Sequence, residues 1–190
     1  MLMGFLGWVG EGSYELVDIV DLSERLHTAA ADGFPFGNVQ DNLDRRIHWA
    51  RTRFGEDGCE RHRRDLDGAL RLLEGLLDDG AREAPVLLHG DLQAKNLIVC
   101  GDRLTAVDPL PVLGPPVFDL AFWIAKSVHD HPTATYLDQV CELRPDTDRD
   151  RLVRWTWALA VLENRPALPR GREQRQEFID GLRPEVLASV

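Results

Sequence analysis

Cysteine is scarce in this sequence and never occurs in close pairs. The three cysteines, Cys59, Cys100 and Cys141, stand far apart, and none belongs to a C-x-x-C motif. A disulfide framework needs a denser, even set, and a structural zinc site needs closely spaced ligands, so this spacing argues against both. We interpret the three side chains as ordinary buried or surface thiols.

Long apolar runs are also absent. No stretch approaches the roughly 18 apolar residues that a membrane-spanning helix requires. The apolar opening MLMGFLGWVG has no basic region and no small-residue cleavage site, and Glu11 follows it directly. It therefore does not resemble a secretory signal. We predict a cytoplasmic protein that does not associate with a membrane.

Positive charge is in short supply, and lysine is nearly missing. The formal net charge is -10, and the only lysines are Lys95 and Lys126. A negative chain is a poor general ligand for the phosphate backbone of nucleic acids, so we expect no nucleic-acid partner. The same charge permits a cationic partner or a divalent metal ion.

What the sequence does contain is the composition of an ordinary globular domain. Its 190 residues, 44% of them hydrophobic, are enough for one domain or one large lobe over 1–190. Apolar residues recur at helical spacing in several segments, and in 38–54 charged residues occupy the positions between them. The segments predicted to be helical are 15–30, 38–54, 60–79, 117–128, 151–164 and 172–182.

Three short apolar runs rich in β-branched residues are too brief for helices and predict strands at 86–88, 97–100 and 104–107. Gly101 and Asp102 separate the last two and suit a two-residue hairpin turn. If Cys100 pairs with Arg103, the register sets Asn96 opposite Val107, and Asp108 then emerges beside Asn96. The fold class predicted is α+β, mainly helical with one small hairpin sheet.

Polar residues interrupt these strands where they end, within the segment 85–123. Asp91 follows the first strand, and the hairpin brings Asn96 and Asp108 to the same end of the sheet. Buried carboxylates are costly unless they are paired or bind a cation. Three such oxygen donors suit Mg²⁺, which binds through one or two carboxylates and keeps positions for water and phosphates. Asp91 could instead act as a base that accepts a proton from an attacking hydroxyl group.

The order of these residues matches a known layout. His89-Gly90-Asp91-x-x-x-x-Asn96 has the spacing of a kinase catalytic loop, in which the base precedes a metal-binding Asn by five positions. Together with AVDP at 106–109, GPP at 114–116 and FDLAFW at 118–123, it resembles the aminoglycoside phosphotransferase family. The Asp-Pro after the second hairpin strand is most similar to the branch of streptomycin 6-phosphotransferases and hydroxyurea kinases.

The resemblance implies a fold, cofactors and roles for individual residues. The chain would be the mainly helical C-terminal lobe of a protein-kinase-like fold, using Mg²⁺ with ATP as phosphate donor. Asp91 would be the catalytic base, and Asn96 and Asp108 the metal ligands. His89 and Asp119 would support the catalytic loop, and Asp119 should be buried and accept hydrogen bonds from the backbone near His89 or Gly90. No residue is assigned to the binding of the nucleotide itself.

The sequence departs from that family in one large respect. No Gly-rich loop with a strand lysine, the elements that hold the ATP phosphates, precedes the catalytic segment. Residues 1–12 resemble the hinge between the two lobes, so we expect the N-terminal nucleotide lobe to be missing and the exposed hinge face to permit self-association. Lys95 replaces a small residue before Asn96, where it could reach a phosphate or obstruct one.

Two functional hypotheses follow from this mixture. The first is an ATP-dependent phosphotransferase acting on a hydroxyl of a small molecule, such as an aminoglycoside in antibiotic resistance. The alternative is a non-catalytic binding or regulatory remnant of such a kinase. The acidic residues Asp41, Asp44, Glu56 and Asp57 could line a pocket for a cationic acceptor, although the solvated face of a helix explains them equally well.

Overall fold

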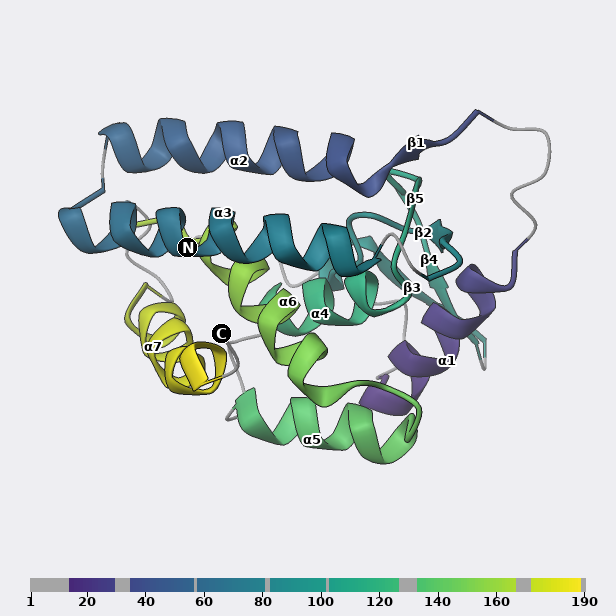
Figure 1. Ribbon diagram of the computed structural model, residues 1–190. Coiled ribbons are helices and arrows are strands. Elements are labelled where there is room, and N and C mark those ends of the chain that lie inside the picture. Colours follow the sequence, from purple (N-terminus) through teal and green to yellow (C-terminus); the bar gives the residue numbers. More distant parts are fainter. Residues whose placement is uncertain are drawn as a thin grey trace, which may run out of the picture.

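A computed structural model describes residues 14–29, 35–56, 58–80, 83–101, 103–126, 133–166 and 172–188. The predicted hinge at 1–12 lies outside these residues, so the hinge and the self-association through it stay predictions. The described chain is α+β, with long helices and short strands (Figure 1). The elements in order are α1 (Leu16–His27), β1 (Gly37–Asn38), α2 (Val39–Glu56), α3 (Glu60–Gly80), β2 (Val86–Leu88), a 3-10 turn (Ala94–Asn96), β3 (Leu97–Cys100), β4 (Arg103–Ala106), β5 (Val112–Gly114), α4 (Val117–Lys126), α5 (Thr133–Leu143), α6 (Arg149–Leu162) and α7 (Arg172–Ala188).

Helix α6 forms the centre of the helical body. It packs against α3, α4 and α7, and α2 lies alongside α3 on the outside (Figure 1). Nearly every residue from Leu152 to Leu162 is buried, as expected for a helix that is apolar all round and surrounded by others. Trp155 is fully buried and meets Phe118 of α4 edge to face, with ring centroids 5.6 Å apart. This packing fixes α4 and the end of α6, the two elements that reach the candidate site.

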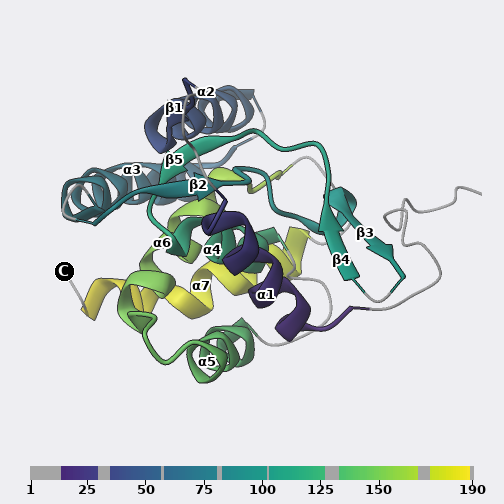
Figure 2. The ribbon, with the colours of Figure 1, turned by 90° about the vertical axis from the view of Figure 1, so that its right-hand side faces the viewer.

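The strands form two small sheets rather than the single hairpin sheet that the sequence predicts. One sheet has the order β1-β5-β2, and the other is the β3-β4 hairpin, which lies next to α1 at the edge of the molecule (Figure 2). The strand β5 was not predicted, because Val112–Gly114 is short and flanked by prolines. Its pairing with β2 is antiparallel and matches Leu88 with Val112. This pairing brings together the two ends of the segment 89–111, which contains Asp91 and the β3-β4 hairpin.

The predicted hairpin register is confirmed. Cys100 pairs with Arg103 and Leu97 with Ala106. The ladder continues one position further, because the backbone N–H of Val107 donates to the carbonyl of Asn96 at 2.8 Å. Gly101 has a φ of 64°, as the first position of either primed two-residue turn requires.

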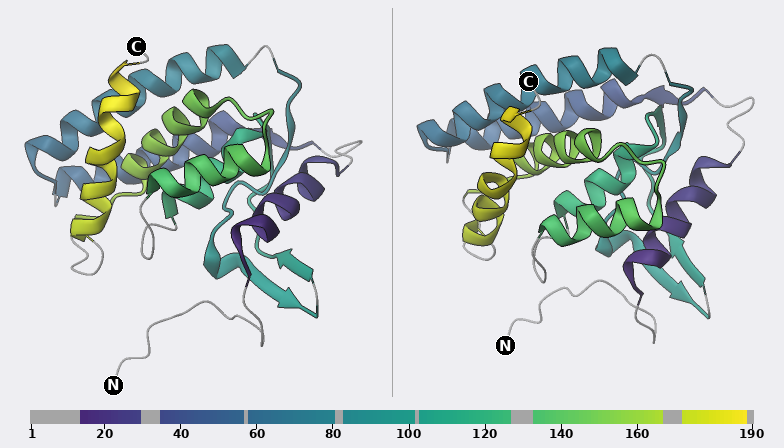
Figure 3. Two further views of the ribbon diagram at one scale, coloured as in Figure 1. Left: turned by 90° about the horizontal axis from the view of Figure 1, so that it is seen from below. Right: turned by 60° about the horizontal axis from the view of Figure 1, so that its bottom comes forward.

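The helices at the remaining edges complete the body. Seen from below, α5 lies across α6 and near α1, away from the paired helices α2 and α3 (Figure 3). The helix α5 was not predicted from the sequence. Within the described ranges, no helix has the length and apolar content of a membrane span.

Candidate functional site

The loop between β2 and the 3-10 turn carries Asp91, and a glycine makes its shape possible. Gly90 has a φ of 72°, in the left-handed region. A side chain there would also have no room, because a Cβ atom would lie 2.2 Å from the backbone oxygen of Leu110. The carbonyl of His89 accepts the N–H of Leu110 at 2.8 Å, which holds the two segments together. Backbone contacts alone therefore hold the loop in a fixed conformation.

A buried carboxylate on α4 holds the start of this loop. Asp119 is fully buried, and its two oxygens accept the backbone N–H groups of His89 at 2.7 Å and Gly90 at 3.0 Å. The hydrogen bonds predicted from the sequence are thus confirmed. Because α4 packs tightly against α6, these hydrogen bonds fix the position of the loop relative to the helical core. Sequence reasoning did not find His27 of α1, whose Nε2 lies 3.6 Å from the same carboxylate.

The side chain of His89 braces the loop from a second direction. The N–H of Asp91 donates to its Nδ1 at 3.2 Å, and its Nε2 lies 3.1 Å from the carbonyl of Val107. A nitrogen that accepts a hydrogen bond carries no proton, so Nε2 carries the ring proton and donates to Val107. His89 therefore ties the Asp91 loop to the end of β4, immediately before Asp108.

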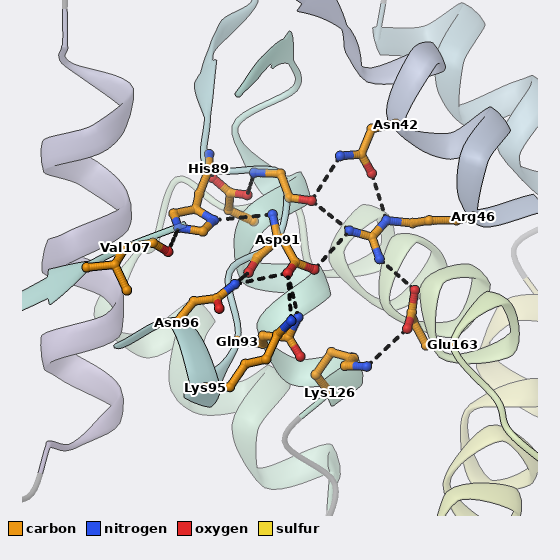
Figure 4. Close-up of polar contacts among 12 residues, drawn as sticks. Asn42, Arg46, His89, Asp91, Gln93, Lys95, Asn96, Val107, Lys126 and Glu163 are labelled. Atoms are coloured by element: carbon orange, nitrogen blue, oxygen red, sulfur yellow. Dashed lines mark hydrogen bonds and ion pairs between the residues drawn. The ribbon is translucent and has the colours of Figure 1, made fainter. Parts of the chain in front are cut away.

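The Asp91 carboxylate is the point where the polar contacts meet (Figure 4). Its Oδ2 accepts from Asn96 Nδ2 at 2.9 Å and Gln93 Nε2 at 2.7 Å, and Lys95 Nζ lies 3.6 Å away. Among the described residues, its Oδ1 has a single partner, Arg46 Nη2 at 3.2 Å. The side chain is 13% exposed, whereas that of Lys95 is 62% exposed, so Lys95 stands at the mouth of the site.

Arg46 of α2 is the main residue that sequence reasoning missed. It is 4% exposed, although the charges of this helix were predicted to lie on the side away from the core. Besides Asp91, it donates to Asn42 Oδ1 at 2.7 Å and to the carbonyl of Gly90 at 2.7 Å. Asn42 donates to the same carbonyl at 2.9 Å. A signal was present, because positions 42 and 46 fall within the apolar stripe of the helix, where a charged residue must have a buried partner.

That partner is Glu163, immediately after α6, and it too was not predicted. Arg46 Nη1 lies 2.6 Å from one of its oxygens, and Lys126 Nζ lies 3.0 Å from the other. The guanidinium also stacks 4.0 Å from the centre of the Phe122 ring. Burial alone would raise the pKa of Glu163, but the charges and hydrogen bonds of Lys126 and Arg46 lower it to about 2. Burial lowers the pKa of Lys126, and Glu163 opposes that change.

The two predicted metal ligands differ in their surroundings. Asn96 is buried, and because its amide nitrogen donates to Asp91, its Oδ1 remains available to a cation. Asp108 is exposed and has a φ of 55°, a left-handed conformation that is uncommon outside glycine. The hairpin places Asp108 one position beyond the Asn96–Val107 hydrogen bond, but no hydrogen bond joins the two side chains.

The donor set determines which cation could bind. In the part of the chain that the structure describes, no three His, Cys, Asp or Glu side chains form a metal-binding group. One amide oxygen and one carboxylate make a weak cage, but they suit Mg²⁺, which usually takes most of its ligands from water and substrate phosphates. The roles of Asp91, Asn96 and Asp108 stay predictions.

Comparison with known proteins shows a distant similarity in structure. No family model matches this chain, and no curated protein matches it significantly. Among solved structures, the chain is similar to the ADP-bound crystal structure of the aminoglycoside phosphotransferase APH(2'')-Ib, with a TM-score of 0.45 and 15% sequence identity. The match covers 90% of this chain, which spans 64% of the length of that protein.

Proposed function

We propose that this chain carries the catalytic loop of an ATP-dependent phosphotransferase that acts on a hydroxyl group of a small molecule. The observation that carries the proposal is the arrangement at Asp91. Asp91 follows β2, and Asp119 and His89 hold the backbone of its loop, while the amide group of Asn96 lies beside its carboxylate. Phosphoryl transfer requires mainly such positioning of a base next to a cation and the phosphates.

The hydrogen bonds of Asp91 suggest which of its oxygens acts as the base. An ionised carboxylate oxygen has two acceptor sites, and Oδ2 already has three partners, Gln93, Asn96 and Lys95. Oδ1 has only Arg46. In the proposed reaction, Oδ1 accepts the proton of the acceptor hydroxyl group, while the other contacts keep the carboxylate from rotating.

The cofactors of this reaction would be Mg²⁺ and ATP. Asn96 Oδ1 and the carboxylate of Asp108 are the groups that would hold the metal ion. When bound, Mg²⁺ would neutralise charge on the phosphates of the donor. We further propose that the phosphate cradle of the nucleotide, including the lysine that the resemblance implies, is supplied from outside these 190 residues. Neither lysine of the chain lies on a strand: Lys95 is in the 3-10 turn and Lys126 ends α4.

A second candidate function is the non-catalytic binding remnant, and one observation favours it. The Asp91 carboxylate is already in contact with two cationic groups, Arg46 and Lys95, so it could serve as a structural ion-pair centre. The two candidates differ in whether bound phosphate is transferred.

Thermal unfolding with and without Mg-ATP tests the metal site. Mg-ATP should raise the midpoint of the wild-type chain by several degrees, because a ligand that binds only the folded state stabilises it. Asp108→Ala should abolish that shift, whereas Asp67→Ala, an exposed carboxylate on α3, should retain it. Equal shifts in the wild type and Asp108→Ala would refute the assignment. In a chain supplied with the nucleotide cradle, binding without phosphate transfer to a panel of aminoglycosides, hydroxyurea and phosphorylated polyols would favour the non-catalytic candidate.

A further inference from the structure

The side of Asp91 that faces Arg46 is unusually rich in positive charge for a chain of net charge -10. Two of the cationic groups there, those of Arg46 and Lys126, contact the Glu163 carboxylate directly. Arg53 and Arg175 lie within electrostatic range of the same carboxylate, which raises their pKa against the lowering effect of burial. Arg165 lies close enough to these cations to lower the pKa of Arg53, Lys126 and Arg175. The cationic cluster consists of Arg46, Arg53, Lys126, Arg165 and Arg175.

The cluster is not neutralised by its own surroundings. Within the described ranges, Glu163 is the one carboxylate that raises the pKa of Arg53, Lys126 and Arg175. Arg53 donates to backbone carbonyls, those of Leu162 and Asn164, and not to an acid. One Nη atom of Arg175 is buried and has no hydrogen-bond partner. Two carboxylates, Glu163 and Asp91, therefore lie among five cationic side chains, and this excess of cations leaves a positive potential.

The position of the cluster separates it from the proposed metal site. Asn96 approaches Oδ2 of Asp91, whereas Arg46 approaches Oδ1, and Figure 4 shows the two on opposite sides of the carboxylate. A base in phosphoryl transfer stands between the donor phosphates and the acceptor hydroxyl group. Because Asn96 belongs to the metal and donor side, the Arg46 side is left for the acceptor. The oxygen with an unused acceptor site, Oδ1, faces that same side.

We propose that the cationic cluster binds an anionic group, a carboxylate or a phosphate, on the acceptor molecule. This inference rests on the proposed phosphotransferase function and narrows its substrate class. It disfavours the polycationic aminoglycoside that the sequence resemblance suggests, because such a molecule would meet Arg46 and Lys126 beside the base. Two of the four acids considered for a cationic pocket make local contacts: Asp41 accepts from the N–H of Asn38, and Asp44 accepts from Gln40. Asp57 lies outside the described residues.

Direct binding measurements without nucleotide test the inference. The probes are glycerol 3-phosphate, inorganic phosphate, uncharged glycerol and kanamycin, titrated calorimetrically into the 190-residue chain at low and high salt. Glycerol 3-phosphate and phosphate should bind, and their affinity should fall as salt rises, because exposed charge is screened. Glycerol should bind at least tenfold more weakly than glycerol 3-phosphate, and kanamycin should show no binding that depends on the cluster.

Two arginine variants form a matched pair for this measurement. Arg165 is exposed just beyond α6, so Arg165→Ala should leave the fold intact. The variant should bind glycerol 3-phosphate about tenfold more weakly, which is the loss of affinity expected when one charged contact is removed. Arg154 lies on the first half of α6 and donates only to the carbonyl of Asp150. Arg154→Ala should bind the probe as the wild type does.

Three results would overturn the inference. The first is that glycerol 3-phosphate binds no more tightly than glycerol. The second is that Arg165→Ala and Arg154→Ala lose the same affinity for glycerol 3-phosphate. The third is full displacement of glycerol 3-phosphate by a Mg²⁺ complex of a non-hydrolysable ATP analogue, which would assign the cluster to the donor. Failure of the proposed function itself is separate, because it would appear as a Mg-ATP thermal shift that does not depend on Asp108.

Discussion

The guanidinium of Arg46 reaches the carboxylate of Asp91 from a helix 45 residues earlier in the chain, with 3.2 Å between Nη2 and Oδ1. The same guanidinium donates to Glu163, 117 residues later. One side chain thus joins α2, the Asp91 loop and the end of α6. The stability of the fold and the geometry of the proposed base depend on the same buried contacts, and the predictions below test them.

Removal of Arg46 should be costly. Arg46→Met leaves the buried Glu163 with Lys126 as its one remaining ion-pair partner among the described residues, and it takes one donor from Asp91. Breaking a buried pair in this way costs about 3–5 kcal/mol. Urea unfolding measures the loss. Arg45→Met is the control, because Arg45 is exposed on the same helix and should change stability by less than about 0.5 kcal/mol. Similar stabilities for the two variants would contradict the buried role of Arg46.

The pH dependence of stability should reveal Glu163. Its pKa is about 2 in the folded chain against an ordinary 4.5, so its contribution is fully present above pH 4.5 and is lost as the pH falls toward 2. The difference corresponds to roughly 3 kcal/mol. Urea unfolding of the wild type and Glu163→Gln at pH 6 and pH 3 measures it. The stability gap between the two proteins should narrow by roughly 2 kcal/mol at the lower pH. A constant gap would show that Glu163 is not paired in the folded state.

Two glycines with positive φ should respond differently to alanine. Gly90→Ala would drive a Cβ atom into the backbone oxygen of Leu110, whereas Gly101→Ala meets no atom within 4 Å. Gly101→Ala should cost about 1–2 kcal/mol for its left-handed backbone alone. Gly90→Ala should cost at least about 2 kcal/mol more, since backbone must move. Thermal or urea unfolding compares them, and equal losses would mean that the contact between the loop and Leu110 is not tight.

Asp119→Asn should loosen the start of the Asp91 loop. An amide can accept only one of the two N–H groups that the carboxylate now accepts, and its NH₂ group would face the other N–H. We expect a loss of about 3 kcal/mol together with faster hydrogen exchange at the amides of His89 and Gly90. The exposed Asp138→Asn serves as control and should leave that exchange unchanged. Unaltered protection of both amides in Asp119→Asn would refute the role of Asp119 as a support.

Turnover of the 190-residue chain by itself should be slow or undetectable, even with the right acceptor. We propose that the nucleotide cradle is supplied from outside the chain, and each electrostatic contact of that kind that is missing costs about 3 kcal/mol, or roughly a hundredfold in rate. An ATP-consumption assay with purified chain measures this. Rapid turnover that disappears in Asp91→Ala would confirm the base and show that the cradle is not needed.

Local patterns in the sequence determined much of this protein. The hairpin register could be predicted because a two-residue turn fixes which residues pair. The contact between Asp119 and the backbone of His89 could also be predicted, although only through the family resemblance. These features depend on residues close in sequence or on a motif with fixed spacing.

The tertiary structure alone decided which charges are buried. Helical periodicity assigns Arg46 to the same stripe as Leu43 and Ala50, but it cannot name a partner that the packing of α6 brings to within 2.6 Å. Arginine is tolerated there because Glu163, Asn42 and the Phe122 ring surround it, and no local pattern links these positions. The gathering of Lys126 and the arginines around one carboxylate has the same origin. Long-range packing, which buries apolar surface first and pairs the trapped charges second, set the charge around Asp91.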